Sequence, residues 1–187
     1  MAKLLYIALI LFLGGNPCPK SGDNKNPKMM ALDNLKNRSA LMQGAPQNIL
    51  ISEFLKPGND VTRFKSSQFV TVTGYIYHVK WGGMETCQCH SANKADLDYH
   101  IEVGADKNHT AKNQLMVWEV NRFNKIESPG LTYAYVQSLT GKTVTVTGWL
   151  FFDEEHINAS ENTHPGGKNN WRATCWEVHS IKSLIAK

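Results

Sequence analysis

The chain has 187 residues, of which 42% are hydrophobic and 19% charged, and its formal net charge is +4. This length suits one domain with an extension, and the hydrophobic share is enough to bury a core. The Lys and Arg residues are scattered, so they do not form the clustered basic patch of a nucleic-acid-binding protein. The patterns G-x-S-x-G, G-x-G-x-x-G and H-E-x-x-H do not occur, which leaves nucleophile-elbow hydrolases, dinucleotide enzymes and zinc proteases of that type without support.

The N-terminus has the layout of an export signal. A short positive start, residues 1–3, precedes an unbroken apolar run, LLYIALILFL, at residues 4–13. Two glycines follow and the chain then turns polar; the run is shorter than the roughly 20 residues that a membrane-spanning helix needs. We therefore expect residues 1–15 to be a signal peptide or N-terminal anchor. The rest would be exported, and so periplasmic, secreted or membrane-anchored, with membrane contact only through this segment.

Residues 16–64 predict a flexible tether and a partly helical extension. Residues 16–30 are rich in Pro, Asn and Lys, which favours a flexible chain. Leu32 and Leu35 then belong to a weak helical pattern. We expect this extension to pack on a domain formed by residues 65–187.

Four cysteines, Cys18, Cys87, Cys89 and Cys175, lie beyond the export signal. Exported proteins fold in oxidising compartments, which favour disulfides. We expect a disulfide from Cys87 or Cys89 to Cys175, although sequence alone does not fix the pairing. A zinc site in the CQCH stretch is the weaker alternative, because C-x-C departs from the usual C-x2-C spacing of zinc ligands.

Alternation of apolar and polar residues marks the predicted strands. The string VTVTG occurs twice, at residues 70–74 and 144–148, and each copy runs on into aromatic and apolar residues. The predicted strands span residues 69–79, 99–103, 115–120, 144–152 and 171–178. The first and fourth contain the repeat, so each carries a glycine within the strand.

One helix is expected between the third and fourth strands. Ser128 can cap its N-terminus, and Pro129 suits the first helical position. Apolar residues recur at four-residue spacing from Leu131 to Leu139 and share one helix face. Gly141 is a natural stop.

Three strands, one helix and two strands follow in the order of the OB-fold. We therefore predict a mainly β fold: a five-stranded OB-like Greek-key barrel with one helix between strands 3 and 4, plus an N-terminal extension. The first and fourth strands of such a barrel bend sharply, and a glycine within a strand permits a bend or bulge. Gly74 and Gly148 are the expected bending points.

A second repeat, WEV, places Glu119 in the third strand and Glu177 in the fifth. These strands are neighbours in an OB barrel, so the two glutamates should lie close together. Asp98 and His100 share a face beside the third strand, with Asp98 expected opposite Glu119, and His179 shares a face with Glu177. Clustered carboxylates need a cation, a proton or a basic partner, and His with carboxylates suits a divalent metal. The alternative is that these are solvated residues on the barrel exterior, or a hydrogen-bonded pair that closes its end.

A ligand is expected between two long loops, because the loop after strand one and the loop between strands four and five flank the usual OB binding face. Aromatic rings on that face could stack on sugars or bases. The predicted ligand-binding residues are Tyr77, Trp81, His156, His164 and Trp171. For the aromatic residues, the alternative is packing in the core.

The strings ETCQCH, DLDYHIEV, QLMVWEV, VTVTGWLFFDEEH and NNWRATCWEVHSI together resemble a loose group of uncharacterised exported bacterial OB-fold-like proteins. That group has D-x-D-x-H-I, G-x-x-F-F-D and W-E-I-H-P-type strings, and the resemblance covers about residues 68–182. Ser180 stands where the group's pattern has Pro. The resemblance implies an exported OB-like domain and a recurring pattern that includes Asp98, His100, Glu119, Glu177 and His179. It implies no activity.

These features lead to three hypotheses. The first is an exported, non-catalytic OB-like binding module for an envelope ligand such as an oligosaccharide. The second is a metal-dependent hydrolase, in which the carboxylate and histidine cluster holds an ion that lowers the pKa of bound water. The third is a structural envelope protein without a small ligand. The sequence favours the first, with no cofactor unless the cluster binds a divalent metal.

Overall fold

A computed structural model describes residues 18–41 and 44–187. The predicted signal peptide, residues 1–15, lies outside the described residues. The strands are β1 (Gln47–Asn48), β2 (Phe69–Trp81), β3 (Tyr99–Gly104), β4 (Met116–Val120), β5 (Thr143–Phe152) and β6 (Trp176–Ala186). The helices are α1 (Pro27–Lys36), α2 (Ile51–Leu55), α3 (Arg122–Glu127) and α4 (Tyr133–Ser138), with 3₁₀ turns η1 (Thr86–Gln88), η2 (Lys112–Gln114) and η3 (Glu154–Ala159).

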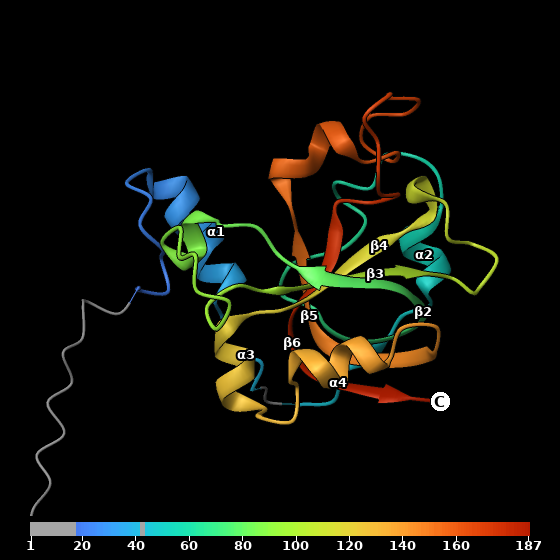
Figure 1. The fold of residues 1–187 in the computed structure, drawn as a ribbon. Coiled ribbons are helices and arrows are strands. Elements are labelled where there is room, and N and C mark those ends of the chain that lie inside the picture. Colours follow the sequence, from blue (N-terminus) through green and yellow to red (C-terminus); the bar gives the residue numbers. More distant parts are fainter. Residues whose placement is uncertain (1–17, 42–43) are drawn as a thin grey trace, which may run out of the picture.

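The sheet closes into a five-stranded barrel. Its order is β2-β3-β4-β6-β5, and β2 also pairs with β5, which completes the circle (Figure 1). The β4–β6 pair is parallel and the other barrel pairs are antiparallel. This confirms the predicted OB-like barrel. The short strand β1 adds to the sheet by pairing in parallel with β2.

The two VTVTG strings pair with each other along the seam where β2 meets β5. Val70 lies opposite Gly148, Val72 opposite Val146, and Gly74 opposite Val144. All four valines of this register are fully buried, so each repeat turns its valines inward. The repeat therefore occurs in two antiparallel strands that pair to close the barrel, and each strand needs a small apolar side chain at every second position to face the core.

Gly148 lies where backbones come too close for a side chain. A Cβ there would lie 2.8 Å from Val178 Cγ1 and 2.9 Å from the carbonyl oxygen of Ser180. The β5–β6 register also shifts on both sides of Gly148, as at a bulge. At Gly74 a Cβ would lie 2.5 Å from Val103 Cγ1, next to the point where β2 leaves β5 and pairs with β3.

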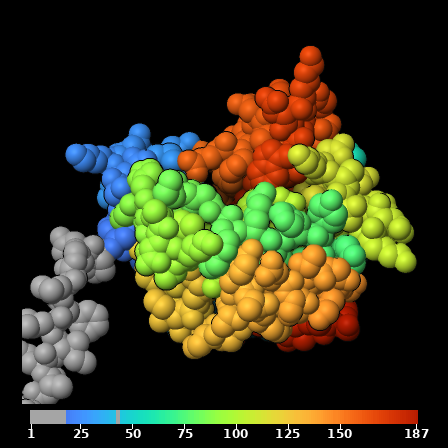
Figure 2. Space-filling view, in the orientation of Figure 1, coloured from blue at the N-terminus to red at the C-terminus, as the bar shows by residue number. Residues whose placement is uncertain are grey.

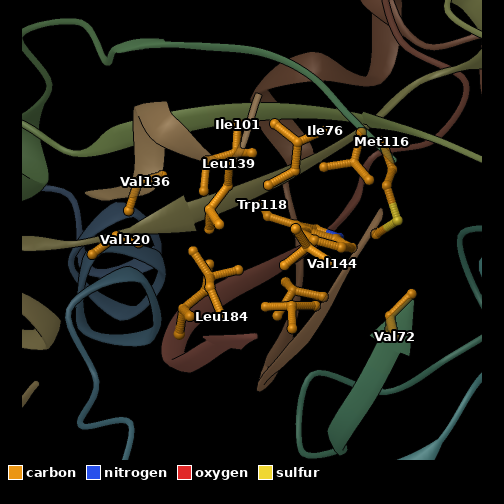
Figure 3. Close-up of a cluster of buried hydrophobic side chains, with 14 of the residues drawn as sticks. Val72, Ile76, Ile101, Met116, Trp118, Val120, Val136, Leu139, Val144 and Leu184 are labelled. Carbon is orange, nitrogen blue, oxygen red and sulfur yellow. The ribbon is translucent and has the colours of Figure 1, made fainter. Parts of the chain in front are cut away.

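The barrel interior is apolar and fully packed. Figure 3 shows side chains from several strands converging there, among them Val72, Ile101 and Trp118. Val136 of α4 and Leu139, the residue that follows this helix, reach the same cluster, so α4 covers one end of the barrel.

The segment between β4 and β5 contains two short helices instead of the one predicted from Ser128. Asn121 caps α3: its side chain accepts from the backbone N–H of Asn124, and the Asn124 side chain accepts in return. Ser128 ends α3, and α4 begins after Thr132, whose side chain accepts from the backbone N–H of Tyr135. The Ser128 hydroxyl donates instead to the carbonyl oxygen of Lys182, so Asn121 and Thr132 provide the N-caps of the two helices.

The last strand begins later than predicted and continues further. Residues 171–175 belong to the β5–β6 loop (residues 153–175). There Arg172 forms an isolated β-bridge with Ser160, and the carbonyl oxygen of Ala173 accepts from the backbone N–H of Asn162. The strand then passes through a left-handed residue, Ser180, with φ of 74°. Beyond this local distortion β6 continues to residue 186, with Ile181 and Leu184 facing the core and Ile185 exposed.

The N-terminal segment lies on the barrel. Cys18 forms a disulfide with Cys89 of the β2–β3 loop (residues 82–98), and the Asn37 side chain donates to the carbonyl oxygens of Lys20 and Cys87. Figures 1 and 2 show α1, in blue, beside this green loop. The sequence predicts a flexible tether up to residue 30; the structure instead holds residues 18–41 against the domain. Within the described ranges, no helix has the length and apolar character to cross a bilayer.

The expected disulfide to Cys175 is wrong. Cys175 and Cys87 are free and buried, and the Cys175 thiol lies 3.1 Å from Ser160 Oγ within the β5–β6 loop. Cys89 follows η1 in a left-handed conformation and pairs with Cys18, which the N-terminal segment brings beside it. A disulfide indicates an oxidising environment.

Candidate functional site

The predicted cluster lies on the outer face of β3, β4 and β6. His100 lies opposite Glu119 across β3–β4, and Glu119 lies opposite His179 across β4–β6. Asp98, expected opposite Glu119, instead immediately precedes β3. The inward residues of these strands, such as Trp118, fill the core, so alternation sends the cluster to the other face.

This outer face is buried rather than solvated. Glu119 is 7% exposed, Asp98 3%, and His179 is fully buried. The β2–β3 loop contributes Asp98, and the last residue of α1, Lys36, is buried beside the same acids. The solvated alternative is therefore wrong for these three side chains.

Asp98, Glu119 and His179 approach one another most closely. One ligand-type atom from each lies within 4.8 Å of those of the other two. His179 Nε2 is 3.9 Å from Asp98 Oδ2, and its Nδ1 is 3.4 Å from Glu119 Oε2. We call these three residues the buried trio.

Glu177 connects the trio to a second charged group. Its Oε2 lies 3.2 Å from His179 Nδ1, and its Oε1 accepts from Arg172 at 2.7 Å. Arg172 is fully buried and also pairs with Asp153, which contacts His156. Glu177 is therefore held between an arginine and a histidine.

Lys36 reaches the cluster from the N-terminal segment. Its Nζ lies 2.7 Å from Glu85 and 3.2 Å from Glu155. Burial opposes the charged form, but Glu85 and Asp153 hold the pKa of Lys36 well above its usual value. The ammonium therefore stays charged. It joins the three segments that cover this face, residues 18–41, the β2–β3 loop and the β5–β6 loop, which we call the covering segments.

The carboxyl groups of the trio are poorly compensated. Burial, with the nearby charges of Glu177 and Glu85, raises the pKa of Glu119 well above its usual value. Burial also raises the pKa of Asp98 to about 6, against the opposing effect of His179. Burial is the main cause of both shifts, and at Glu119 the neighbouring carboxylates add to it.

His100 differs from the trio because it faces basic neighbours. Burial, with Lys80 and Arg172, lowers the pKa of His100 to about 3, so its imidazole is neutral at ordinary pH. Its Nδ1 lies 3.1 Å from Glu119 Oε1, and its ring lies 5.5 Å from that of Trp171.

The structure does not bring the five predicted ligand-binding residues together at one place. Trp171 and His156 lie together, with ring centroids 5.3 Å apart, and Tyr77 is exposed beside Lys80. Trp81 stacks on Tyr133 at 4.2 Å and packs against the core, as its alternative interpretation held.

His164, the last of the predicted set, is exposed in the β5–β6 loop, where its backbone carbonyl oxygen accepts from the Asn170 side chain.

Sequence reasoning missed Lys36, Arg172 and Asp153. Lys36 is one of many lysines in a polar stretch, so no pattern marks it as buried. Arg172 and Asp153 stand at the two ends of one loop, and only the folded loop brings them together. The acidic DEEH string after β5 was the one available signal for Asp153.

Comparison with models of known protein families gave no match, and comparison with curated proteins gave none. The interpretation of this site therefore comes from its own geometry.

Proposed function

We propose that this protein is an exported, non-catalytic OB-like binding module whose ligand is an envelope component, an acidic oligosaccharide in particular. The observation that carries the proposal is a surface cavity of about 490 Å³ on the outer face of β2 and β3. Tyr77, His78, Lys80, Glu102 and Lys112 line it. OB barrels usually bind oligosaccharides on the outer face of their second and third strands, here β3 and β4, and the cavity adjoins that face through Glu102 of β3.

The chemistry of the cavity suits a sugar chain. Tyr77 is 47% exposed and offers a ring face for stacking. Lys80 Nζ lies 2.7 Å from Glu102 Oε1 and 5.6 Å from the centroid of the Trp171 ring, so a second aromatic surface adjoins the cavity. Two lysines against one glutamate favour an anionic ligand.

Export is the second part of the proposal. The apolar run at residues 4–13 supports it, and so does the Cys18–Cys89 disulfide, since disulfides persist in oxidising compartments.

A metal-dependent hydrolase is the weaker candidate. A catalytic ion needs an open position that substrate and water can reach. The side chains of the buried trio are at most 10% exposed, beneath the covering segments. A structural envelope protein would need no cavity lined by aromatic and charged side chains.

The proposal is tested by calorimetric titration with neutral and acidic oligosaccharides. We expect saturable binding of an acidic member, and Lys80→Ala should weaken it by about tenfold, which corresponds to the loss of about 1.4 kcal/mol, near the value of one charged hydrogen bond. The control is Lys65→Ala, because Lys65 is exposed and does not line the cavity. Absence of binding across the panel would contradict the proposal, and so would equal loss in both variants.

A further inference from the structure

We propose that Asp98, Glu119 and His179 bind one divalent first-row transition cation, such as Mn²⁺ or Zn²⁺, between the β2–β3 loop and strands β4 and β6. The inference is independent of the proposed oligosaccharide binding, because the buried trio does not line the surface cavity.

The donor atoms have a suitable spacing. A cation about 2.1 Å from each donor cannot hold two donors more than about 4.2 Å apart. His179 Nε2 and Asp98 Oδ2, 3.9 Å apart, are within this limit, and the three donor atoms of the trio lie within 4.8 Å of one another, so the side chains need only draw in slightly to close around an ion. Two carboxylates and one imidazole form a mixed O and N donor set that suits Mn²⁺, Fe²⁺ or Zn²⁺.

Two buried atoms of the trio have no partner. Asp98 Oδ1 and His179 Nε2 make no hydrogen bond with any described residue. Their side chains are 4% and 0% exposed. A buried polar atom without a partner is costly, and Nε2 faces the Asp98 carboxylate across the space that a cation would fill.

The surroundings of His179 match those of a metal-bound histidine. Its Nδ1 lies 3.2 Å from Glu177 Oε2 and 3.4 Å from Glu119 Oε2, whereas Nε2 has no hydrogen-bond partner among the described residues and is the nitrogen available to a metal. Glu177 in turn accepts from Arg172 at 2.7 Å. A carboxylate that orients a histidine in this way is the usual second partner of a metal ligand.

The balance of charge also favours a cation. Four carboxyl groups in and around the trio are buried, those of Asp98, Glu119, Asp153 and Glu177. Arg172 pairs with two of them, Asp153 and Glu177. Lys36 pairs instead with Glu85 and Glu155. Asp98 and Glu119 therefore have no lysine or arginine partner among the described residues: His179 contacts both, and the neutral His100 contacts Glu119.

The expected role of the ion is structural. Asp98 ends the β2–β3 loop, whereas Glu119 and His179 belong to adjacent parallel strands. A shared ion would therefore fix this loop, which also carries the disulfide to the N-terminal segment, on the barrel surface.

The test uses the disulfide-bonded protein, dialysed against a chelator and then titrated with Mn²⁺, Zn²⁺ or Mg²⁺ alone. Calorimetry should give one Mn²⁺ or Zn²⁺ per chain with weaker Mg²⁺ binding, and the melting temperature should rise on loading. Glu119→Gln should weaken binding more than tenfold. In metal-free protein the same variant should be at least as stable as the parent, because one repelling carboxylate becomes neutral; this separates lost binding from lost folding.

Glu53→Gln is the matched control. Glu53 is exposed in α2 and belongs neither to the trio nor to the surface cavity, so this variant should bind the cation as the parent does. Folded parent protein that takes up neither Mn²⁺ nor Zn²⁺ would overturn the inference. Equal binding by Glu119→Gln and the parent would also overturn it, since the ion would then sit on surface histidines.

Discussion

Gly148→Ala should destabilise the barrel because the added methyl group has no space. The ideal Cβ would lie 2.8 Å from Val178 Cγ1, 2.9 Å from Ser180 O and 3.2 Å from Ile181 Cα. Two of these three neighbours are backbone atoms of β6, which cannot rotate away, so the strands must separate locally.

The expected cost follows from two opposing effects. Forcing a methyl group into a packed site costs about 1–3 kcal/mol. Replacing glycine reduces the conformational freedom of the unfolded chain, which returns about 0.4–1 kcal/mol. We therefore expect the free energy of unfolding to fall by about 1–2 kcal/mol, and the melting temperature to fall by roughly 2–8 °C for a chain of this size.

Urea unfolding followed by circular dichroism measures this change, with Gly83→Ala as the matched control. A Cβ at Gly83 would meet no atom within 4 Å, so its free energy of unfolding should stay within about 0.5 kcal/mol of the parent. If Gly148→Ala were as stable as the parent, the close approach of β5 and β6 at this glycine would be refuted.

Two further predictions concern the covering segments. The Cys18–Cys89 disulfide joins residues 71 apart, so its removal in a Cys18→Ser, Cys89→Ser variant should lower the free energy of unfolding by about 4 kcal/mol at most. Equal stability of variant and parent in urea would contradict a folded N-terminal segment, and a reducing agent should leave the variant unchanged. For Asp153, burial raises its pKa, but the His156 hydrogen bond and Arg172 outweigh this and lower it below 3.8. The stabilising effect of Asp153 is therefore present above about pH 4 and is lost as the pH falls below that value. Asp153→Asn should lower the free energy of unfolding by about 3–5 kcal/mol at pH 7. In urea unfolding at a series of pH values, the difference in this free energy between variant and parent should shrink towards about pH 3. A difference that is constant with pH would show that Asp153 is not held ionised.

The sequence predicts the barrel well because its strands depend on local alternation. The VTVTG repeats, the WEV pairs and the helical segment before residue 143 follow from neighbours within a few residues. The helix start at Ser128 is wrong because the Ser128 hydroxyl bonds the carbonyl oxygen of Lys182 in β6, a contact distant in the sequence, while Asn121 and Thr132 cap the two helices.

The candidate site is only partly predictable from the sequence. The strand register brings His100, Glu119 and His179 together. The alternation of side chains between the two faces of each strand is enough to predict that they share one face. The burial of these residues depends on Lys36 and Cys18, which are distant in the chain and lie in a polar stretch. No periodic pattern encodes such contacts, because they arise only when separate segments fold over one face.

The central claim, that the face beside Lys80 and Trp171 binds an acidic oligosaccharide, is tested most directly by NMR of the tryptophan indole N–H signals. Trp118 is fully buried in the barrel and serves as an internal reference. We expect the Trp171 signal to shift saturably as the oligosaccharide is added while the Trp118 signal stays in place. A fixed Trp171 signal, with or without shifts at Trp81, would contradict it.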